Sequence, residues 1–307
     1  MAISSDTREA FDESGLNPRG ASPLKKPLHA RLASCVVERR VPWICVRLGR
    51  KLDVELYRLK CLWEHWRPDP AGGHLAASYA RNPRCLYASA VGREGKPLLE
   101  SIIESVDVPD MDFLVFCYDD TSFDEDVFRD IRLIRTKGLK WQLMKKYLTP
   151  DLCRNYDYIF AWDDDIAVDG FSFRRFMEIM RRNRLEAAQP ALTPDSYVSI
   201  GLTRRHAGVA GRFTDAIENM VPVFTRPAWE KYWVSLEEHG SFWGWQHVDT
   251  ARSACGYRRM GIIDRECVRH TRPVRSKRTT AREEQQSYFD RHPELTRARR
   301  IVYGHMK

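Results

Sequence analysis

The sequence lacks several features that would assign it to a class of protein at once. Its eight cysteines are scattered and form no C-x-x-C pair, which argues against a zinc site or a disulfide framework and favours reduced, buried thiols. Uncharged apolar runs fall far short of a spanning helix, so a membrane-embedded protein is excluded. Met1–Leu16 shows no secretory signal, so we expect a cytoplasmic protein, with a Golgi-associated one as the alternative if an N-terminal anchor is missing.

The composition is otherwise that of an ordinary globular chain, with 307 residues, 43% hydrophobic and 30% charged, but its net charge of +8 is unevenly spread. Arg19–Lys60 holds 11 Lys and Arg against three carboxylates, whereas Glu100–Asp130 holds 11 carboxylates against one Arg. Basic segments attract either nucleic acids or phosphorylated small molecules. No zinc finger, aromatic-rich sheet signature or heptad-flanked basic region supports the first, so we expect no specific nucleic-acid partner.

Proline, glycine and charge divide the chain into four segments. Residues 1–26 are predicted to be a disordered tail, and residues 27–73 a helical extension that ends in the linker Pro-Asp-Pro-Ala-Gly-Gly. Residues 74–274 form the main domain, and residues 275–307 a charged C-terminal tail.

Apolar runs alternate with helical patterns through the main domain. Strands are predicted at Cys85–Val91, Phe113–Tyr118, Tyr156–Trp162, Glu218–Thr225 and Gly261–Asp264. Helices are predicted at Asp53–Trp66, Lys96–Ser105, Asp126–Arg135, Leu139–Leu148, Phe171–Arg182, Pro227–Leu236 and Trp243–Cys255. This alternation predicts an α/β fold with a doubly wound, mostly parallel sheet flanked by helices, followed by an irregular C-terminal half. Because ligands bind at the carboxyl ends of such strands, we expect Gly92, Asp119 and Asp120 near the triplet Asp163–Asp165.

The aspartate triplet is the strongest chemical signal. Three carboxylates that directly follow an apolar strand repel one another unless a cation or a basic cluster neutralises them. Oxygen ligands suit Mg²⁺ or Mn²⁺, which can keep positions open for the phosphates of a substrate. A solvated turn or a helix N-cap is the simpler interpretation of the same residues.

Two later segments contain further candidate residues. In Gly261–Pro273, His270 offers a nitrogen ligand to the same cation, and Arg269 and Arg272 can pair with phosphate oxygens. Taken alone, His270 favours a surface or structural role, and the presence of the triplet favours a ligand instead. In the segment Phe-Trp-Gly-Trp-Gln-His-Val-Asp, Trp243 and Trp245 offer aromatic platforms for a sugar or fill the core. Asp249 there offers a general base. A further acidic candidate at the substrate is Glu218.

These segments, taken in order from YDYIFAWDDD through EAAQPAL, ENMVPVFTRPAW and FWGW to GIID…VRHTRP, resemble a domain-of-unknown-function family over roughly Arg84–Val274. Its members often carry the label "lysine-ketoglutarate reductase trans-splicing related". The family in turn resembles the glycosyltransferase-A superfamily of nucleotide-sugar enzymes, which have a D-x-D motif and a Mn²⁺ or Mg²⁺ ion. The resemblance implies that Asp163 faces the donor ribose and the metal, that Asp165 binds the metal, and that His270 completes metal or diphosphate binding.

The resemblance also implies that Gly92, Asp119 and Asp120 lie near the nucleotide. Lys137 or Lys140 is expected to reach a phosphate, a prediction that rests only on their position in the sequence. Gln246 is also predicted to contact the acceptor or the sugar, and it departs from the pattern, because related sequences tend to carry an aspartate close to this position. Glutamine cannot act as a base, whereas Asp249 lies three residues further on and shares its helix face.

The sequence therefore predicts a metal-dependent glycosyltransferase with a nucleotide-sugar donor and an unknown hydroxyl acceptor, in which Asp249 is the base if the reaction inverts the anomeric centre. Two alternatives stay open. One is a non-catalytic nucleotide-sugar or glycan-binding protein that keeps the fold, which Gln246 favours. The other is a basic nucleic-acid-binding protein.

Overall fold

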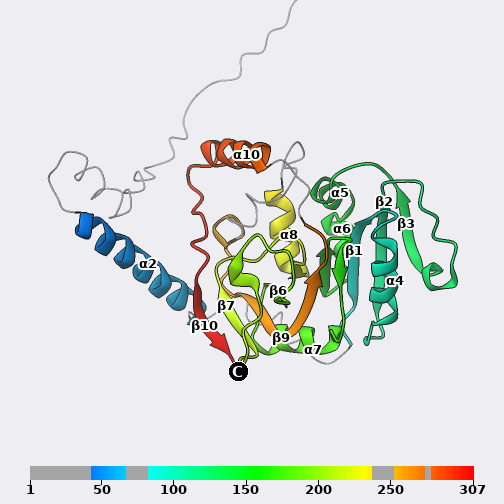
Figure 1. The fold of residues 1–307 in the computed structure, drawn as a ribbon, viewed down its shortest axis with the longest axis horizontal. Helices are drawn as coiled ribbons and strands as arrows, with labels where there is room; N and C mark the ends of the chain where they lie inside the picture. The colour runs from blue at the N-terminus through cyan, green and yellow to red at the C-terminus, as the bar shows by residue number, and fades with distance from the viewer. Residues whose placement is uncertain (1–42, 67–81, 237–251, 274–277) are drawn as a thin grey trace, which may run out of the picture. The chain divides into compact units, whose positions relative to one another are not determined.

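The computed structural model describes residues 43–66, 82–236, 252–273 and 278–307 (Figure 1). The chain divides into two compact units, residues 1–53 and 54–307. The described part of the first unit is the beginning of helix α2 (Trp43–Trp66), which starts ten residues before the predicted helix Asp53–Trp66. The predicted tail at residues 1–26 lies outside the described residues.

The second unit is built on one sheet with the strand order β3-β2-β1-β4-β8-β6-β9-β7-β10, and β5 pairs with β9 beside this path. The strands are β1 (Cys85–Val91), β2 (Met111–Cys117), β3 (Ile131–Arg135), β4 (Tyr158–Trp162), β5 (Ile166–Ala167), β6 (Ala187–Leu192), β7 (Gly211–Thr214), β8 (Val223–Thr225), β9 (Met260–His270) and β10 (Val302–Met306). Along the nine-strand path, β8 and β7 run opposite to the other strands, so the sheet is mostly parallel.

Helices cover both faces of this sheet (Figure 1). They are α4 (Lys96–Glu104), α5 (Lys140–Tyr147), α6 (Pro150–Cys153), α7 (Phe173–Arg182) and α8 (Arg226–Ser235), and the chain also forms α10 (Arg278–Arg291) before its last strand. Alternate residues of β1 point to opposite faces, as the period of two in a strand requires. Tyr87 packs in one core with residues of α4 and α7. Leu86 packs in a second core with residues of α5, α6 and α8. The predicted α/β fold with a mostly parallel sheet flanked by helices is confirmed.

The registers of the parallel strands bring their carboxyl ends to one edge of the sheet. Val91 of β1 pairs with Cys117 of β2, and Ser89 of β1 pairs with Trp162 of β4. The residues that follow these strands, Gly92, Tyr118 and Asp163, therefore begin at neighbouring points of that edge. This geometry is what the order of strands and polar residues along the sequence predicts.

Several predicted elements differ from the structure. The predicted strand Gly261–Asp264 extends over Met260–His270. The predicted helix Asp126–Arg135 is wrong, because a short 3₁₀ turn at Asp126–Phe128 leads into strand β3, which pairs in parallel with β2. Its apolar residues fit a helical period as well as a strand, and pairing with β2 decides between the two. The predicted strand Glu218–Thr225 is confirmed only over Val223–Thr225, since Pro222 lacks the N–H that a central strand needs.

The C-terminal segment expected as a charged tail contributes to the sheet. Its residues form α10 and then β10, an edge strand antiparallel to β7.

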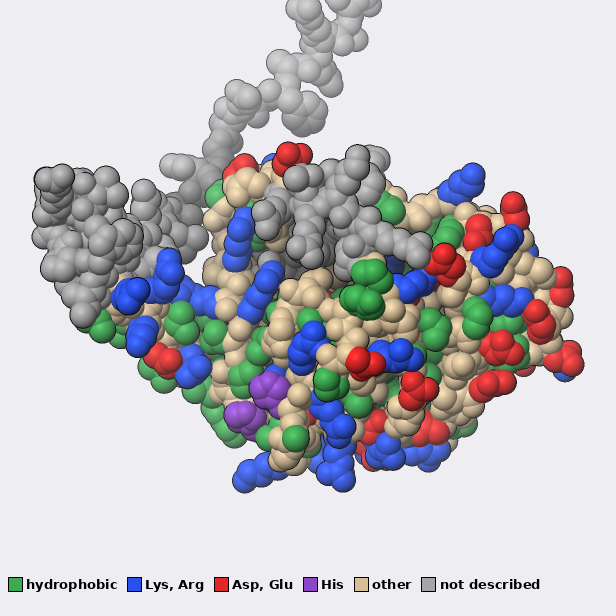
Figure 2. Space-filling view, viewed as in Figure 1, with side chains coloured by type: hydrophobic (Ala, Val, Ile, Leu, Met, Phe, Trp, Pro, Cys, Tyr) green, Lys and Arg blue, Asp and Glu red, His purple; other side chains and the backbone are tan. Residues whose placement is uncertain are grey.

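Acidic side chains gather at the right of the face shown in Figure 2, over the end of the sheet that holds α4 and β3. This position agrees with the acidic segment Glu100–Asp130 of the sequence. Among the described helices, none is long and apolar enough to cross a membrane.

Candidate functional site

A cavity of about 760 Å³ lies at the carboxyl ends of β1, β2 and β4. Its charged lining residues are Arg93, Glu94, Asp119, Asp120, Lys140, Asp163, Asp164, Asp165, His270 and Arg272. Two aromatic side chains, Tyr118 and Trp141, also line it. The volume is that of a small-molecule site, and the charges of both signs suit a ligand with phosphates and hydroxyls.

Each carboxylate of the triplet has a basic partner of its own. Asp163 pairs with Lys140 at the start of α5, at 2.7 Å between Oδ1 and Nζ. Asp164 accepts a hydrogen bond from Arg272 Nη2 at 2.6 Å. Asp165 Oδ2 lies 3.2 Å from Nε2 of His270, the last residue of β9. Basic side chains therefore lie against all three of the consecutive aspartates.

Asp164 also joins the ends of the three parallel strands. Tyr118 donates its hydroxyl hydrogen to Oδ2 of Asp164 at 2.9 Å, and the backbone N–H of Gly92 lies at 3.4 Å from the same atom. Burial raises the pKa of Asp164, against the opposing effect of the Arg272 guanidinium. The side chain of Asp164 thus holds the loops after β1 and β2 in place beside the cavity.

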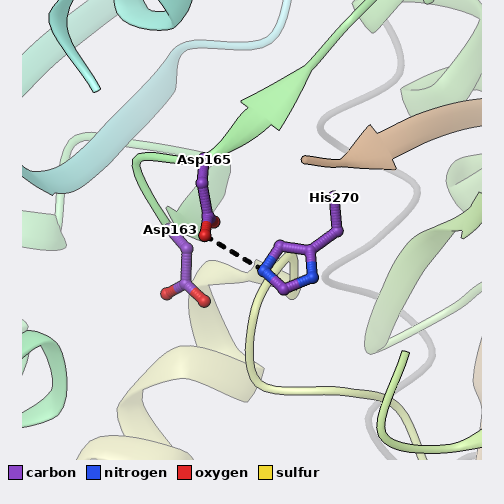
Figure 3. Close-up of side chains that lie close together, drawn as sticks. All are labelled: Asp163, Asp165 and His270. Carbon is purple, nitrogen blue, oxygen red and sulfur yellow. Dashed lines mark ion pairs between the residues drawn. The ribbon is translucent and has the colours of Figure 1, made fainter. Parts of the chain in front are cut away.

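His270 is aimed at Asp165 by a hydrogen bond on its other side. Its Nδ1 lies 2.6 Å from the backbone oxygen of Tyr197, which leaves Nε2 facing the carboxylate. Burial lowers the pKa of His270, but the hydrogen bond to Asp165 and the negative charge of that carboxylate raise it by more. The net effect is a pKa above the ordinary value for histidine. Figure 3 shows the imidazole pointing toward Asp165, with the carboxylate of Asp163 beside it.

These residues fit a divalent cation. One ligand atom from each of Asp163, Asp165 and His270 lies within 4.8 Å of the others. Oδ1 of Asp165 is buried and accepts no hydrogen bond from the part of the chain that the structure describes, although a buried carboxylate oxygen normally has a partner. Two carboxylates and an imidazole form a donor set that Mn²⁺ accepts readily, and Mg²⁺ accepts the oxygens.

Two glycines allow the loop after β1 to approach the triplet. A Cβ on Gly92 would lie 2.4–2.6 Å from the ring and hydroxyl atoms of Tyr118, and a Cβ on Gly95 would lie 2.5 Å from Oδ2 of Asp164. Both distances are shorter than van der Waals contact. The position of Gly92 directly after a predicted strand marks it in the sequence, whereas the importance of Gly95 depends on this tertiary contact.

The aspartates after β2 have different environments. Asp119 accepts hydrogen bonds from the backbone N–H groups of Arg93 and Thr121, at 2.9 and 3.0 Å. Hydrogen bonds from Thr121 and Arg93 lower the pKa of Asp119 to about 2, so it is ionised at neutral pH. Asp120 is exposed and lines the cavity. Asp119 therefore braces the loop after β1, while Asp120 is open to a ligand.

Arg269 and Glu218 are not brought to the cavity lining. Because alternate strand residues face opposite sides, Arg269 points away from His270, and its guanidinium lies 3.9 Å from Asp169 and Asp195. Glu218 is buried, and it accepts hydrogen bonds from Ile200 N at 2.8 Å and from the hydroxyl of Thr203 at 2.9 Å. Burial raises the pKa of Glu218, which here supports the turn beside cavity residue Ser199.

Four predicted site residues, Trp243, Trp245, Gln246 and Asp249, lie outside the described residues. The structure adds others that the sequence analysis did not single out, including Tyr118, Arg93, Glu94, Trp141 and Asn219. Tyr118 carried a usable signal, because it directly follows β2. Nothing in the sequence marked Asn219, because its link to the site is a hydrogen bond that its backbone oxygen accepts from the distant Lys140 side chain.

Comparison with known proteins gives one family and distant structural matches. The family model described as "Protein of unknown function (DUF707)" matches residues 58–213, which include the aspartate triplet but not His270 or Arg272. No curated protein matches the chain. Among solved structures, Staphylococcus aureus TarS 1–349 matches at 10% identity with a TM-score of 0.44, over 61% of this chain and 60% of that one. A structure of S. aureus TarS matches at 8% identity with a TM-score of 0.41, over 62% of this chain and 37% of that one.

Proposed function

This chain belongs to the DUF707 family, which is described only as of unknown function, and from the geometry of its cavity we propose that it is a metal-dependent glycosyltransferase. It would move a sugar from a nucleotide-sugar donor to a hydroxyl acceptor. The observation that carries the proposal is the convergence of Asp163, Asp165 and His270 at the carboxyl ends of parallel strands. It is supported by Oδ1 of Asp165, which is buried and has no hydrogen bond from the described residues.

The proposed metal ligands are Asp165 and His270, with Asp163 completing the set. When bound, a divalent cation supplies Lewis-acid neutralisation of charge on the leaving diphosphate. Arg272 stands at the same edge, where its guanidinium hydrogen-bonds Asp164 at 2.6 Å and Glu94 at 2.7 Å. A diphosphate offers Arg272 the bidentate oxygens that guanidinium prefers, so we expect the donor to replace the exposed Glu94 as its partner.

The remaining cavity residues suit the other parts of a donor. Tyr118 and Trp141 offer aromatic faces for a base or a sugar ring. The exposed carboxylate of Asp120 can accept hydrogen bonds from ribose or sugar hydroxyls. Deprotonation of the acceptor hydroxyl by Asp249, in an inverting reaction, remains part of the proposal from sequence.

The test is turnover of a donor panel. UDP-sugars and GDP-sugars are incubated with the full chain and Mn²⁺, and release of the nucleoside diphosphate is measured with and without EDTA. We expect release from one donor, lost with EDTA and lost in Asp165→Asn. Asp169→Asn is the matched control, since its side chain is 86% exposed and lies outside the cavity lining. Release that is equal with EDTA, or unchanged in Asp165→Asn, would contradict the proposal.

A second candidate has one observation in its favour. Lys140, Arg272 and His270 already pair with the three aspartates, so each of these carboxylates has a basic neighbour without a metal ion. A non-catalytic nucleotide-sugar or glycan-binding protein would need no more than this. It predicts binding of a nucleotide or sugar that is indifferent to EDTA, without release of nucleoside diphosphate from any donor.

A further inference from the structure

A second cavity, of about 560 Å³, lies on the other side of helix α5. The residues at the start of α5 divide between the two cavities: Lys140 and Trp141 line the first, whereas Gln142 and Leu143 line the second. The side chains of Gln142, Lys145 and Lys146 share one face of the helix by their i, i+3 and i+4 spacing. The second cavity is therefore a separate space and not a lobe of the first.

The charged side chains that line the second cavity are all positive. Lys137, Lys145 and Lys146 all line it, and no Asp or Glu is among its described lining residues. Lys137 and Lys146 are exposed, and Nζ of Lys146 lies 5.0 Å from the centre of the Tyr147 ring. Three ammonium groups around one cavity repel one another, so an anion that enters gains from all three.

One of the three lysines is held rigidly. Lys145 donates a hydrogen bond from Nζ to the backbone oxygen of Trp233 at 2.8 Å, and Nζ lies 3.8 Å from the centre of that indole ring. The indole N–H of Trp233 in turn donates to the backbone oxygen of Lys145 at 2.8 Å. These reciprocal contacts fix one wall of the cavity, so little ordering is needed when a ligand enters.

Uncharged polar side chains complete the lining. Thr136, Gln142 and Thr149 line the cavity. Gln142 Oε1 already accepts a hydrogen bond from Leu139 N at 3.2 Å, and Thr149 Oγ1 accepts one from Leu152 N at 3.3 Å, so the amide NH₂ of Gln142 and the hydroxyl hydrogen of Thr149 are the donors left for sugar hydroxyls. The volume falls in the range of small-molecule sites and is far larger than an isolated phosphate needs. Lysine ammonium groups bind phosphate as point charges.

We propose that this cavity, lined by Lys137, Lys145 and Lys146, is a binding site for a small anionic sugar that carries a phosphate or a carboxylate. Lys137 and Lys146 contact the anionic group, and the threonines and Gln142 contact the sugar hydroxyls. The site is independent of the glycosyltransferase activity proposed above, because it shares no lining residue with the first cavity.

The test is protection of individual lysines from acetylation, measured by mass spectrometry on the full chain without added metal. The probes are glucose 6-phosphate, glucuronate, inorganic phosphate and glucose. Glucose 6-phosphate or glucuronate is expected to slow acetylation of Lys137 and Lys146 several-fold, and the comparison between them identifies the anionic group. Acetylation of Lys60 and Lys307, which lie outside the cavity lining, is expected to be unchanged.

Variants make the result independent of folding defects. Lys137→Gln with Lys146→Gln removes two exposed charges and is expected to abolish binding of the sugar anion in calorimetry. Lys60→Gln with Lys307→Gln removes the same charge elsewhere and is expected to leave binding intact. The proposal is overturned if no anionic sugar binds, if inorganic phosphate protects as well as either anionic sugar, if all four lysines are protected alike, or if both double variants bind equally. None of these outcomes depends on donor turnover.

Discussion

The ammonium nitrogen of Lys140 lies 2.7 Å from Oδ1 of Asp163, and the same nitrogen donates to the backbone oxygens of Asn219 at 2.6 Å and Met220 at 3.3 Å. One side chain at the start of α5 thereby ties the end of β4 to the segment before β8. The carboxylate that pairs with Lys140, that of Asp163, is also one of the proposed ligands of the divalent cation. The proposed metal site and the folding of this edge of the sheet are therefore coupled.

Replacing Lys140 tests that coupling. Lys140→Met leaves the Asp163 carboxylate and two backbone oxygens without this donor, so we expect the free energy of unfolding to fall by about 2 kcal/mol in urea titrations. Mn²⁺ is expected to stabilise the variant more than the wild-type protein, because Asp163 is released from its ion pair. Lys231→Met is the control, since its ion pair with Glu186 is long, at 3.9 Å, and half exposed. Equal stabilisation by Mn²⁺ in the wild type and Lys140→Met would count against competition for Asp163.

The contact between Gly92 and Tyr118 gives a second prediction. In Gly92→Ala the new Cβ would displace the Tyr118 ring and break its hydrogen bond to Asp164. We expect a loss of roughly 1–3 kcal/mol in unfolding free energy, as is usual for overpacking. Gly201→Ala is the matched control, because a Cβ there meets no atom within 4 Å. The double variant Gly92→Ala with Tyr118→Ala should recover part of the loss, and no recovery would place the strain elsewhere.

His65 of α2 predicts a dependence of stability on acid pH. Its side chain is buried, 7% exposed, against the ring of Phe213 at 4.4 Å. Burial, together with the charges of Arg259, Arg252 and Arg258, lowers the pKa of His65 to about 4. Since the unfolded chain binds a proton near pH 6.5, the stability from neutral His65 is present above that pH and is lost as pH falls toward 4.

The comparison of His65→Gln with the wild-type protein isolates this effect from other titrating groups. The wild-type protein should lose up to about 3 kcal/mol more than the variant between pH 7 and pH 4. The measurement is the urea midpoint at each pH. Parallel pH profiles for the two proteins would show that His65 titrates normally in the folded state.

The sequence was sufficient to predict most of the edge on which the site lies. Apolar runs that end in polar residues marked β1, β2 and β4, and parallel strands have one direction, so Asp119, Asp120 and the triplet had to meet. The helix α7 was equally clear, because Phe173, Phe176, Met177 and Met180 share one buried face.

Other features could not be predicted because they depend on distant partners. Ile131–Arg135 becomes a strand through pairing with β2, and its apolar residues fitted a helix as well. Arg269 points away from the cavity because the face of this end of β9 is set by its pairing with β5, where Ala167 lies opposite Arg269. The partners of the triplet lie 23 residues before it and more than 100 after it, a separation that no local pattern reveals.

The most direct test of the account is the melting temperature with UDP or GDP, each with and without Mn²⁺, in the wild type, Asp165→Asn and Asp169→Asn. A ligand at about 100 times its dissociation constant should add roughly 2.7 kcal/mol, a shift of several degrees. We predict a shift that needs both Mn²⁺ and one nucleotide, that persists in Asp169→Asn and that disappears in Asp165→Asn. A shift that is the same without Mn²⁺, or that survives in Asp165→Asn, would contradict a metal-dependent donor site.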